Sequence, residues 1–252
     1  MSRSLRVFAE EMMWELSYIS RYPVFEILLG FFAFITMLNF AELSGASSCS
    51  IDALSKYYSL HRHLILITMN NSILILFLIT SLLTATLFTR GMEFGYLRDE
   101  LSLPVTRGSL FLAKLFSAFL LLFFSILTSF LLCLLFLDPI GGIIHAMLSY
   151  RILHVIAFVA TEIVLPLSIS LLFSVLGRSY LPSMLSSFIF LVGLYLLAPR
   201  TPLFQIILPT VAIIKDLSYL SLMDISIATI KWGISLILMS SSYYYFEKRV
   251  EI

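Results

Sequence analysis

Long, uninterrupted apolar runs constrain the fold of this 252-residue chain more than any other feature of its sequence. A helix needs about 20 apolar residues to cross roughly 30 Å of hydrocarbon at about 1.5 Å per residue. Six segments meet this requirement, at about residues 24–40, 64–88, 110–137, 152–177, 181–198 and 225–246. Because the runs are continuous and do not alternate, they favour helices over the strands of a membrane barrel. We therefore expect an all-α membrane protein with six transmembrane helices.

Composition excludes several classes of protein. Apolar residues make up 60% of the chain and charged residues 12%, whereas a soluble domain has roughly 45–50% and about 25%. A soluble globular enzyme is therefore excluded. The net charge of +1 provides no field suited to nucleic acid, so we expect no nucleic-acid partner. Glu10, Glu11 and Glu15 lie where a signal peptide needs its apolar stretch, so we expect no cleavage.

Lysine and arginine indicate the orientation, because cytoplasmic loops collect positive charge. With six spans both termini share one side, which holds ten of the 16 basic residues: Arg3, Arg6, Arg21, Arg90, Arg98, Arg107, Lys114, Arg178, Lys248 and Arg249. The other side holds the remainder over longer loops: Lys56, Arg62, Arg151, Arg200, Lys215 and Lys231. We therefore predict a multi-pass protein of the cell membrane with both termini in the cytoplasm.

Two segments are apolar or amphipathic without spanning the membrane. Residues 1–23 place apolar side chains on one helical face and charges on the other, up to Pro23, and predict an interfacial helix on the cytoplasmic surface. An amphipathic helix packed on other protein is the alternative, and both interpretations can hold on different faces. Residues 199–224 are apolar but interrupted by prolines, which predicts short re-entrant helices before the last span. The six-span transmembrane domain is thus expected at 24–252.

The predicted outer loop at about residues 41–63 contains His61 and His63. Two histidines in this spacing bind a metal only if further ligands come from elsewhere in the chain. A solvated or headgroup-contacting loop is favoured, so we expect no metal site.

The connection after the second span carries more charged residues than the other connections between predicted spans. Residues 92–101 fit a short helix with charged groups toward solvent: Glu93, Arg98, Asp99 and Glu100. Its apolar face would be formed by Phe94, Tyr96, Leu97 and Leu101, before Pro104 resets the backbone. Aromatic anchors with flanking charges make the segment at about 90–104 a candidate docking element for a soluble partner. A loop that merely joins two spans is the alternative.

This connection resembles the signature of ABC type-2 transporter permeases, in which these residue types recur at fixed spacing. The matching residues are Arg90, Glu93, Gly95, Leu97, Leu101, Pro104, Val105, Thr106, Arg107 and Lys114. The six spans, the amphipathic first helix and the broken outer segment match the family's architecture over nearly the whole chain. Tyr96, Asp99, Glu100 and Ala113 depart from the residues usual in the family.

The resemblance implies the permease subunit of an ATP-driven exporter, which is not itself an enzyme. Two such subunits, identical or paralogous, pair in the bilayer, and each binds a separate cytoplasmic ABC ATPase. The sequence contains no Gly-x-x-x-x-Gly-Lys-Ser/Thr loop, so ATP and magnesium belong to the partner and we expect no cofactor in this chain. The coupling helix of the family corresponds to Glu93, Phe94, Tyr96, Leu97, Arg98, Asp99 and Glu100.

Further charged residues lie near or inside the predicted membrane. Arg107 and Lys114 are expected to anchor the third span at the anionic cytoplasmic surface. Glu162 lies near the middle of the fourth span, where an ionised carboxylate must face protein or water. A structural hydrogen bond to another helix and a role in substrate passage or proton handling are both open.

The second span carries a polar side formed by Asn70, Asn71, Thr80, Ser81, Thr84 and Thr86. Such a side suits either close helix packing or the lining of a cavity. Glu162, Asn70 and Asn71 are therefore candidates for the translocation path.

Two other classes of function are alternatives, a membrane-embedded enzyme and a secondary transporter without an ATPase partner. The sequence contains no Gly-x-Ser-Gly, His-Glu-x-x-His or repeated Asp-x-x-x-Asp pattern. A secondary transporter usually has more spans and inverted repeats. Apolar spans around a shared cavity fit a lipid, glycolipid, hydrophobic peptide or drug, and the sequence does not distinguish these.

Overall fold

The computed structural model describes residues 3–20, 26–27, 30–38, 71–95, 106–137, 151–198, 200 and 222–250, and the regular structure in these ranges is helical. The elements are α1 (Arg3–Ser20), α4 (Ile73–Thr84), the π-helix η1 (Ala85–Thr89), α5 (Arg90–Glu93), α7 (Arg107–Leu137), α9 (Arg151–Leu176), α10 (Tyr180–Leu197) and α12 (Leu222–Val250). The expectation of an all-α protein is confirmed for this part of the chain.

Within the described residues, four helical stretches are long and apolar enough to cross a membrane, namely Ile73–Glu93, Arg107–Ser129, Ile156–Leu176 and Tyr180–Leu197. They correspond to the second to fifth predicted spans. α12 is a helix of 29 residues at the sixth predicted run, and residues 30–38 are helical within the first. The count of six spans stays a prediction, and the re-entrant segment at 199–224 falls almost entirely outside the described residues, as do His61 and His63.

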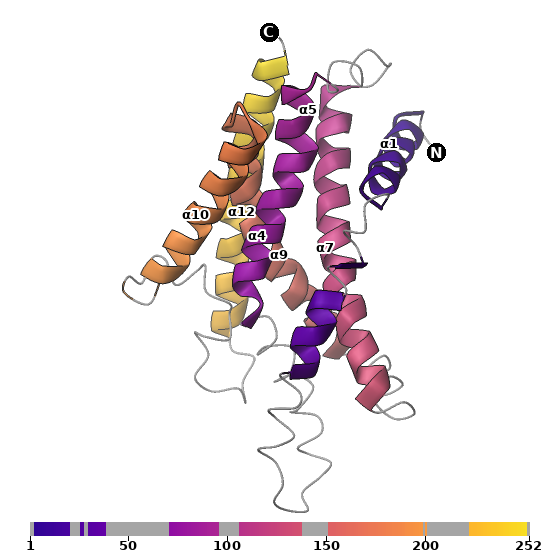
Figure 1. Cartoon of the computed structure of the whole chain (residues 1–252), viewed down its shortest axis with the longest axis vertical. Coiled ribbons are helices and arrows are strands. Elements are labelled where there is room, and N and C mark those ends of the chain that lie inside the picture. The colour runs from indigo at the N-terminus through magenta and orange to yellow at the C-terminus, as the bar shows by residue number, and fades with distance from the viewer. Residues whose placement is uncertain are drawn as a thin grey trace, which may run out of the picture.

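The long helices form one bundle and run along it in two opposite directions (Figure 1). α4, α9 and α12 run one way, and α7 and α10 run the other. The hydrogen-bonded pairs Thr80–Ser170 and Thr84–Ser174 are both 90 residues apart, as expected of parallel helices α4 and α9. We call the end of the bundle where α5 lies the α5 end; α7 and α10 begin there and α12 ends there.

α9 is the central helix, packed against α4, α7, α10 and α12. Its side chains are all buried from Thr161 to Leu171. Pro166 lies inside this stretch, and because proline has no N–H it cannot donate the helical hydrogen bond to the carbonyl of residue 162. The backbone of α9 is therefore weakened at its buried middle.

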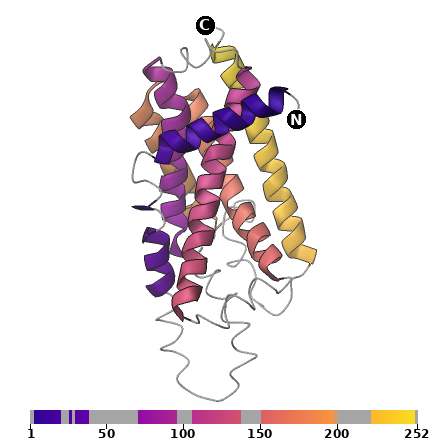
Figure 2. The ribbon, with the colours of Figure 1, turned by 90° about the vertical axis from the view of Figure 1, so that its right-hand side faces the viewer.

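α1 lies across α7 near the α5 end, at a steep angle to the bundle helices (Figure 2). The Phe8 and Phe116 rings meet edge to face with centroids 6.1 Å apart, while Met13 and Trp14 are exposed. One face of this amphipathic helix thus packs on protein and the other is left open. Its placement at the membrane surface stays a prediction.

Candidate functional site

The predicted coupling segment begins where the second span ends. α4 passes without interruption through η1 into α5, and the helix stops at Phe94. Gly95 follows with φ of +79°, a left-handed conformation that glycine adopts readily and that commonly ends a helix. The glycine of the signature therefore lets the chain leave the membrane helix immediately after α5.

The Glu93 side chain is hydrogen-bonded to another helix of the same chain. Its Oε2 accepts a hydrogen bond of 2.7 Å from the backbone N–H of Tyr180, the first residue of α10. Ser179, at the N-cap of α10, makes no side-chain capping bond, so Glu93 supplies a carboxylate where the helix dipole favours negative charge. The end of the second span and the start of α10 are thereby joined.

Phe94, which follows Glu93, is 61% exposed. The Arg90 guanidinium lies over its ring, 5.9 Å from the centroid, an arrangement that favours one orientation of the aromatic side chain. The other predicted coupling residues lie outside the described ranges: Tyr96, Leu97, Arg98, Asp99 and Glu100.

We expected Lys114 to anchor the third span at lipid headgroups, and the structure places it elsewhere. It is buried and forms an ion pair with Glu15 of α1, because α1 crosses α7 at this point. Nearer the start of α7, the Ser109 hydroxyl donates to Glu11 Oε2 at 2.8 Å. Arg107 is the half-buried first residue of α7, and its role as an anchor stays a prediction.

A row of hydroxyl groups joins α4 and η1 to the half of α9 that lies toward the α5 end. Ser174 Oγ donates to Thr84 Oγ1 at 3.0 Å, and Thr89 Oγ1 donates to the carbonyl oxygen of Ser174 at 2.7 Å. Ser170 Oγ lies 3.4 Å from both Thr80 Oγ1 and Ser81 Oγ. We call these residues the hydroxyl seam, and all of them are buried: Thr80, Ser81, Thr84, Thr89, Ser170 and Ser174.

The hydroxyl seam favours the packing interpretation of the polar side of the second span. Its hydroxyls are buried and bond to α9 or to their own helix. Asn71 is exposed at the start of the second span, and Asn70 lies outside the described residues.

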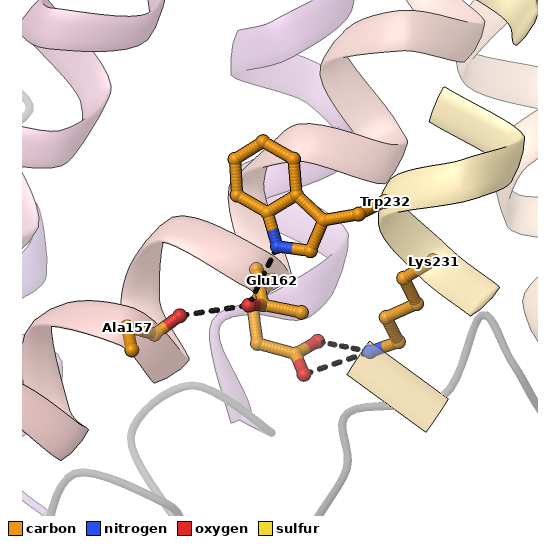
Figure 3. A network of polar contacts seen from close by, with 5 residues as sticks. Ala157, Glu162, Lys231 and Trp232 are labelled. Atoms are coloured by element: carbon orange, nitrogen blue, oxygen red, sulfur yellow. Dashed lines mark hydrogen bonds and ion pairs between the residues drawn. The ribbon is translucent and has the colours of Figure 1, made fainter. Parts of the chain in front are cut away.

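An ion pair joins the other half of α9 to α12. Lys231 Nζ donates to Glu162 Oε1 at 2.7 Å and to Oε2 at 2.8 Å (Figure 3). The Lys231 and Glu162 side chains are only 1% and 2% exposed. Of the two roles left open for Glu162, the structure provides the link to another helix.

A second hydrogen bond lies beside this ion pair. Trp232 Nε1 donates to Thr161 Oγ1 at 3.1 Å, and Thr161 Oγ1 donates to the carbonyl oxygen of Ala157 at 2.7 Å (Figure 3). We call Thr161, Glu162, Lys231 and Trp232 the ion-pair seam. Pro166 is four residues from Glu162 and four from Ser170, so it separates the two seams along α9.

The sequence that forms these helices matches a known protein family. The profile described as ABC-2 family transporter protein matches residues 14–194, well over half of the chain. The chain belongs to the ABC-2 transporter family. The match includes the signature segment and both seam-forming parts of α9. A comparison with curated proteins found no match.

Membership confirms the resemblance noted in the sequence. As an ABC-2 protein with several apolar helices, the chain is a multi-pass permease component of a transporter. The family's permeases work with an ATPase subunit, which supports the expected kind of partner.

Sequence reasoning missed Lys231 in this permease. We counted it among the residues of the outer loops, but it lies in α12 and is buried against Glu162. Two signals pointed to the pair. Lys231 falls inside the apolar run at 225–246, and a carboxylate in another span needs a partner.

Proposed function

We propose that this ABC-2 permease forms the membrane path of an exporter and is driven by a separate cytoplasmic ABC ATPase that binds at the α5 end. The observation that carries the proposal is Phe94, 61% exposed at the end of a membrane helix and directly before the charged residues 98–100. An exposed aromatic side chain next to charges is typical of the anchor of a protein interface.

Contacts behind Phe94 offer a route by which ATPase movement reaches the membrane helices. Glu93 ties the segment to α10, and Thr89 ties η1 to α9. ATP and magnesium act in the partner, whose closure biases the permease between two access states because it binds them unequally. Motion at the coupling segment therefore moves several helices together.

The proposed orientation places the α5 end and both termini in the cytoplasm. The distribution of lysine and arginine supports it, as does the Lys248 ammonium over the Tyr244 ring at 4.5 Å, a basic and aromatic pair suited to a membrane interface. A second permease subunit, identical or paralogous, completes the path. The substrate is a hydrophobic or amphipathic molecule such as a lipid, glycolipid, peptide or drug.

Affinity purification in mild detergent tests the proposal. Phe94→Ala and Arg98→Glu are each expected to lower the yield of co-purified ABC ATPase at least about tenfold, the effect of losing an interface hot spot. Phe124→Ala is the matched control, because Phe124 on α7 is also exposed but lies away from the α5 end. Normal ATPase capture and transport in both coupling variants would contradict the proposal.

A further inference from the structure

We propose that the ion-pair seam is a binding site for the anionic headgroup of an amphiphilic substrate, in which a phosphate or carboxylate replaces Glu162 at Lys231. The inference rests on the proposed function, because it assumes that substrate passes along this permease. It adds the chemical class of the substrate and the residues that bind it.

Hydrogen-bond donors gather on α12. Lys231 Nζ and Trp232 Nε1 donate to α9, and Ser235 lies one turn beyond Lys231, on the same side of the helix. Ser235 is buried, and its hydroxyl has no hydrogen-bond partner among the described residues. An anion has acceptor oxygens for an ammonium, an indole N–H and a hydroxyl together.

The acceptors for the first two donors are on α9, and separating the helices would remove them. A lysine left alone in the membrane is strongly unfavourable. Another acceptor that takes the place of Glu162 at Lys231 would therefore favour the parting of α12 from α9 at this level. An anionic headgroup does this, so its binding and the opening of the seam favour one another.

Pro166 permits the opening. It interrupts the helical hydrogen bonds of α9 immediately beside Glu162. The half of α9 that carries Glu162 can bend, while Ser170 and Ser174 stay bound to α4 through the hydroxyl seam.

The seam also has an accessible edge. Trp232 is 40% exposed although Lys231 beside it is buried, and Leu236, one turn further along α12, is 58% exposed. These two side chains provide an apolar flank next to the ammonium, which fits a molecule with one anionic group and an apolar tail. The Lys231 ammonium, the Trp232 indole N–H and the Ser235 hydroxyl place three donors on α12, which favours an anion.

Tryptophan fluorescence gives a direct test. The chain has two tryptophans, so Trp14→Phe leaves Trp232 as the only reporter. The full-length protein in phosphatidylcholine nanodiscs is titrated with dodecyl phosphate. We expect a saturable change in Trp232 emission and no change with dodecyl maltoside or dodecyltrimethylammonium. A response to the cationic or neutral compound equal to that of dodecyl phosphate would overturn the proposal.

Inorganic phosphate is titrated in parallel to distinguish the two sources of the anion. We expect no response, because the free ion lacks the tail that binds Trp232 and Leu236. An equal response to inorganic phosphate would overturn the assignment to an amphiphile.

Two substitutions have opposite expected effects. Lys231→Met removes the cation and should abolish the response, whereas Glu162→Gln removes the competing carboxylate and should lower the midpoint about tenfold. Lys248→Met, on the same helix, is the matched control and should titrate normally. If the ion pair is only structural, Glu162→Gln will bind dodecyl phosphate no more tightly than the parent protein does. That result would overturn the proposal.

The double variant Glu162→Gln/Lys231→Met removes both charges of the ion pair together. It should fold, as judged by size-exclusion chromatography, and fail to respond; a normal response would overturn the proposal. ATPase capture is measured on the same samples. Capture without a Trp232 response refutes only this inference, whereas a response without capture refutes the proposed function.

Discussion

Toward its Leu176 end α9 meets α4 through hydroxyl groups, and toward its Arg151 end it meets α12 through an ion pair. Hydroxyl hydrogen bonds between membrane helices contribute about 0.6 kcal/mol each on average. Breaking a buried ion pair by removing one partner costs about 3–5 kcal/mol, because the remaining charge is left uncompensated. The hydroxyl seam therefore loses little when one contact is removed, whereas the ion-pair seam loses much when one partner is removed.

The two seams lie in different halves of α9, on either side of Pro166. The hydroxyl seam includes Thr89 of η1, directly before α5, so it keeps one half of α9 with the coupling segment. The ion-pair seam lies beyond Pro166 and holds the other half to α12. One helix thus joins the end where we expect the ATPase to bind to the place where we expect substrate.

The largest effect on stability is expected from Lys231→Met. It removes the ammonium that bonds to both oxygens of the buried Glu162 carboxylate, and the free energy of unfolding should fall by about 3–5 kcal/mol. Thermal unfolding in detergent measures the change. The double variant Glu162→Met/Lys231→Met should recover most of the loss, and an unchanged single variant would show that the pair carries little stability.

Glu15 of α1 and Lys114 of α7 form a second buried ion pair. Glu15→Leu removes the carboxylate that pairs with buried Lys114, and we expect α1 to detach from α7 at a cost of about 3 kcal/mol. Hydrogen exchange of residues 3–20 should rise strongly. Ser109→Ala, which removes only the hydroxyl bond to Glu11, is the control and should change exchange much less. Equal effects of the two substitutions would contradict the distinction between ionic and hydroxyl contacts.

The hydroxyl seam should respond weakly. Ser174→Ala removes the hydrogen bond to Thr84 but keeps the carbonyl that accepts from Thr89, so the unfolding free energy should fall by about 1 kcal/mol. A double-mutant cycle with Thr84→Val should give a coupling of about 0.6 kcal/mol. A coupling as large as that of the ion pair would remove the contrast between the seams.

The smallest change in stability is expected for Pro166→Ala. Alanine restores an N–H that can bond to the carbonyl of residue 162. The greater freedom of the unfolded chain offsets this gain, so stability should change by no more than about 1 kcal/mol. Hydrogen exchange in residues 156–165 should slow while transport falls. Unaltered exchange and normal transport would show that α9 does not bend at this residue.

The sequence predicts the helices better than it predicts their contacts. Apolar runs locate the described membrane helices, and the amphipathic pattern before Pro23 locates α1, because both signals are local in the chain. Glu162 and Lys231 are 69 residues apart and Glu93 and Tyr180 are 87 apart, so their pairing depends on which helices become neighbours. Lys114 shows the same limit, since only the docking of α1 makes it a partner of Glu15.

Site-specific photocrosslinking at residue 94 tests the central claim most directly. A photoreactive phenylalanine analogue replaces Phe94 in cells that express the transporter, with the same replacement at Phe124 as the control. The account predicts a covalent adduct between position 94 and the ABC ATPase and none from position 124. An ATPase that co-purifies with the permease but never crosslinks to position 94 would contradict the account.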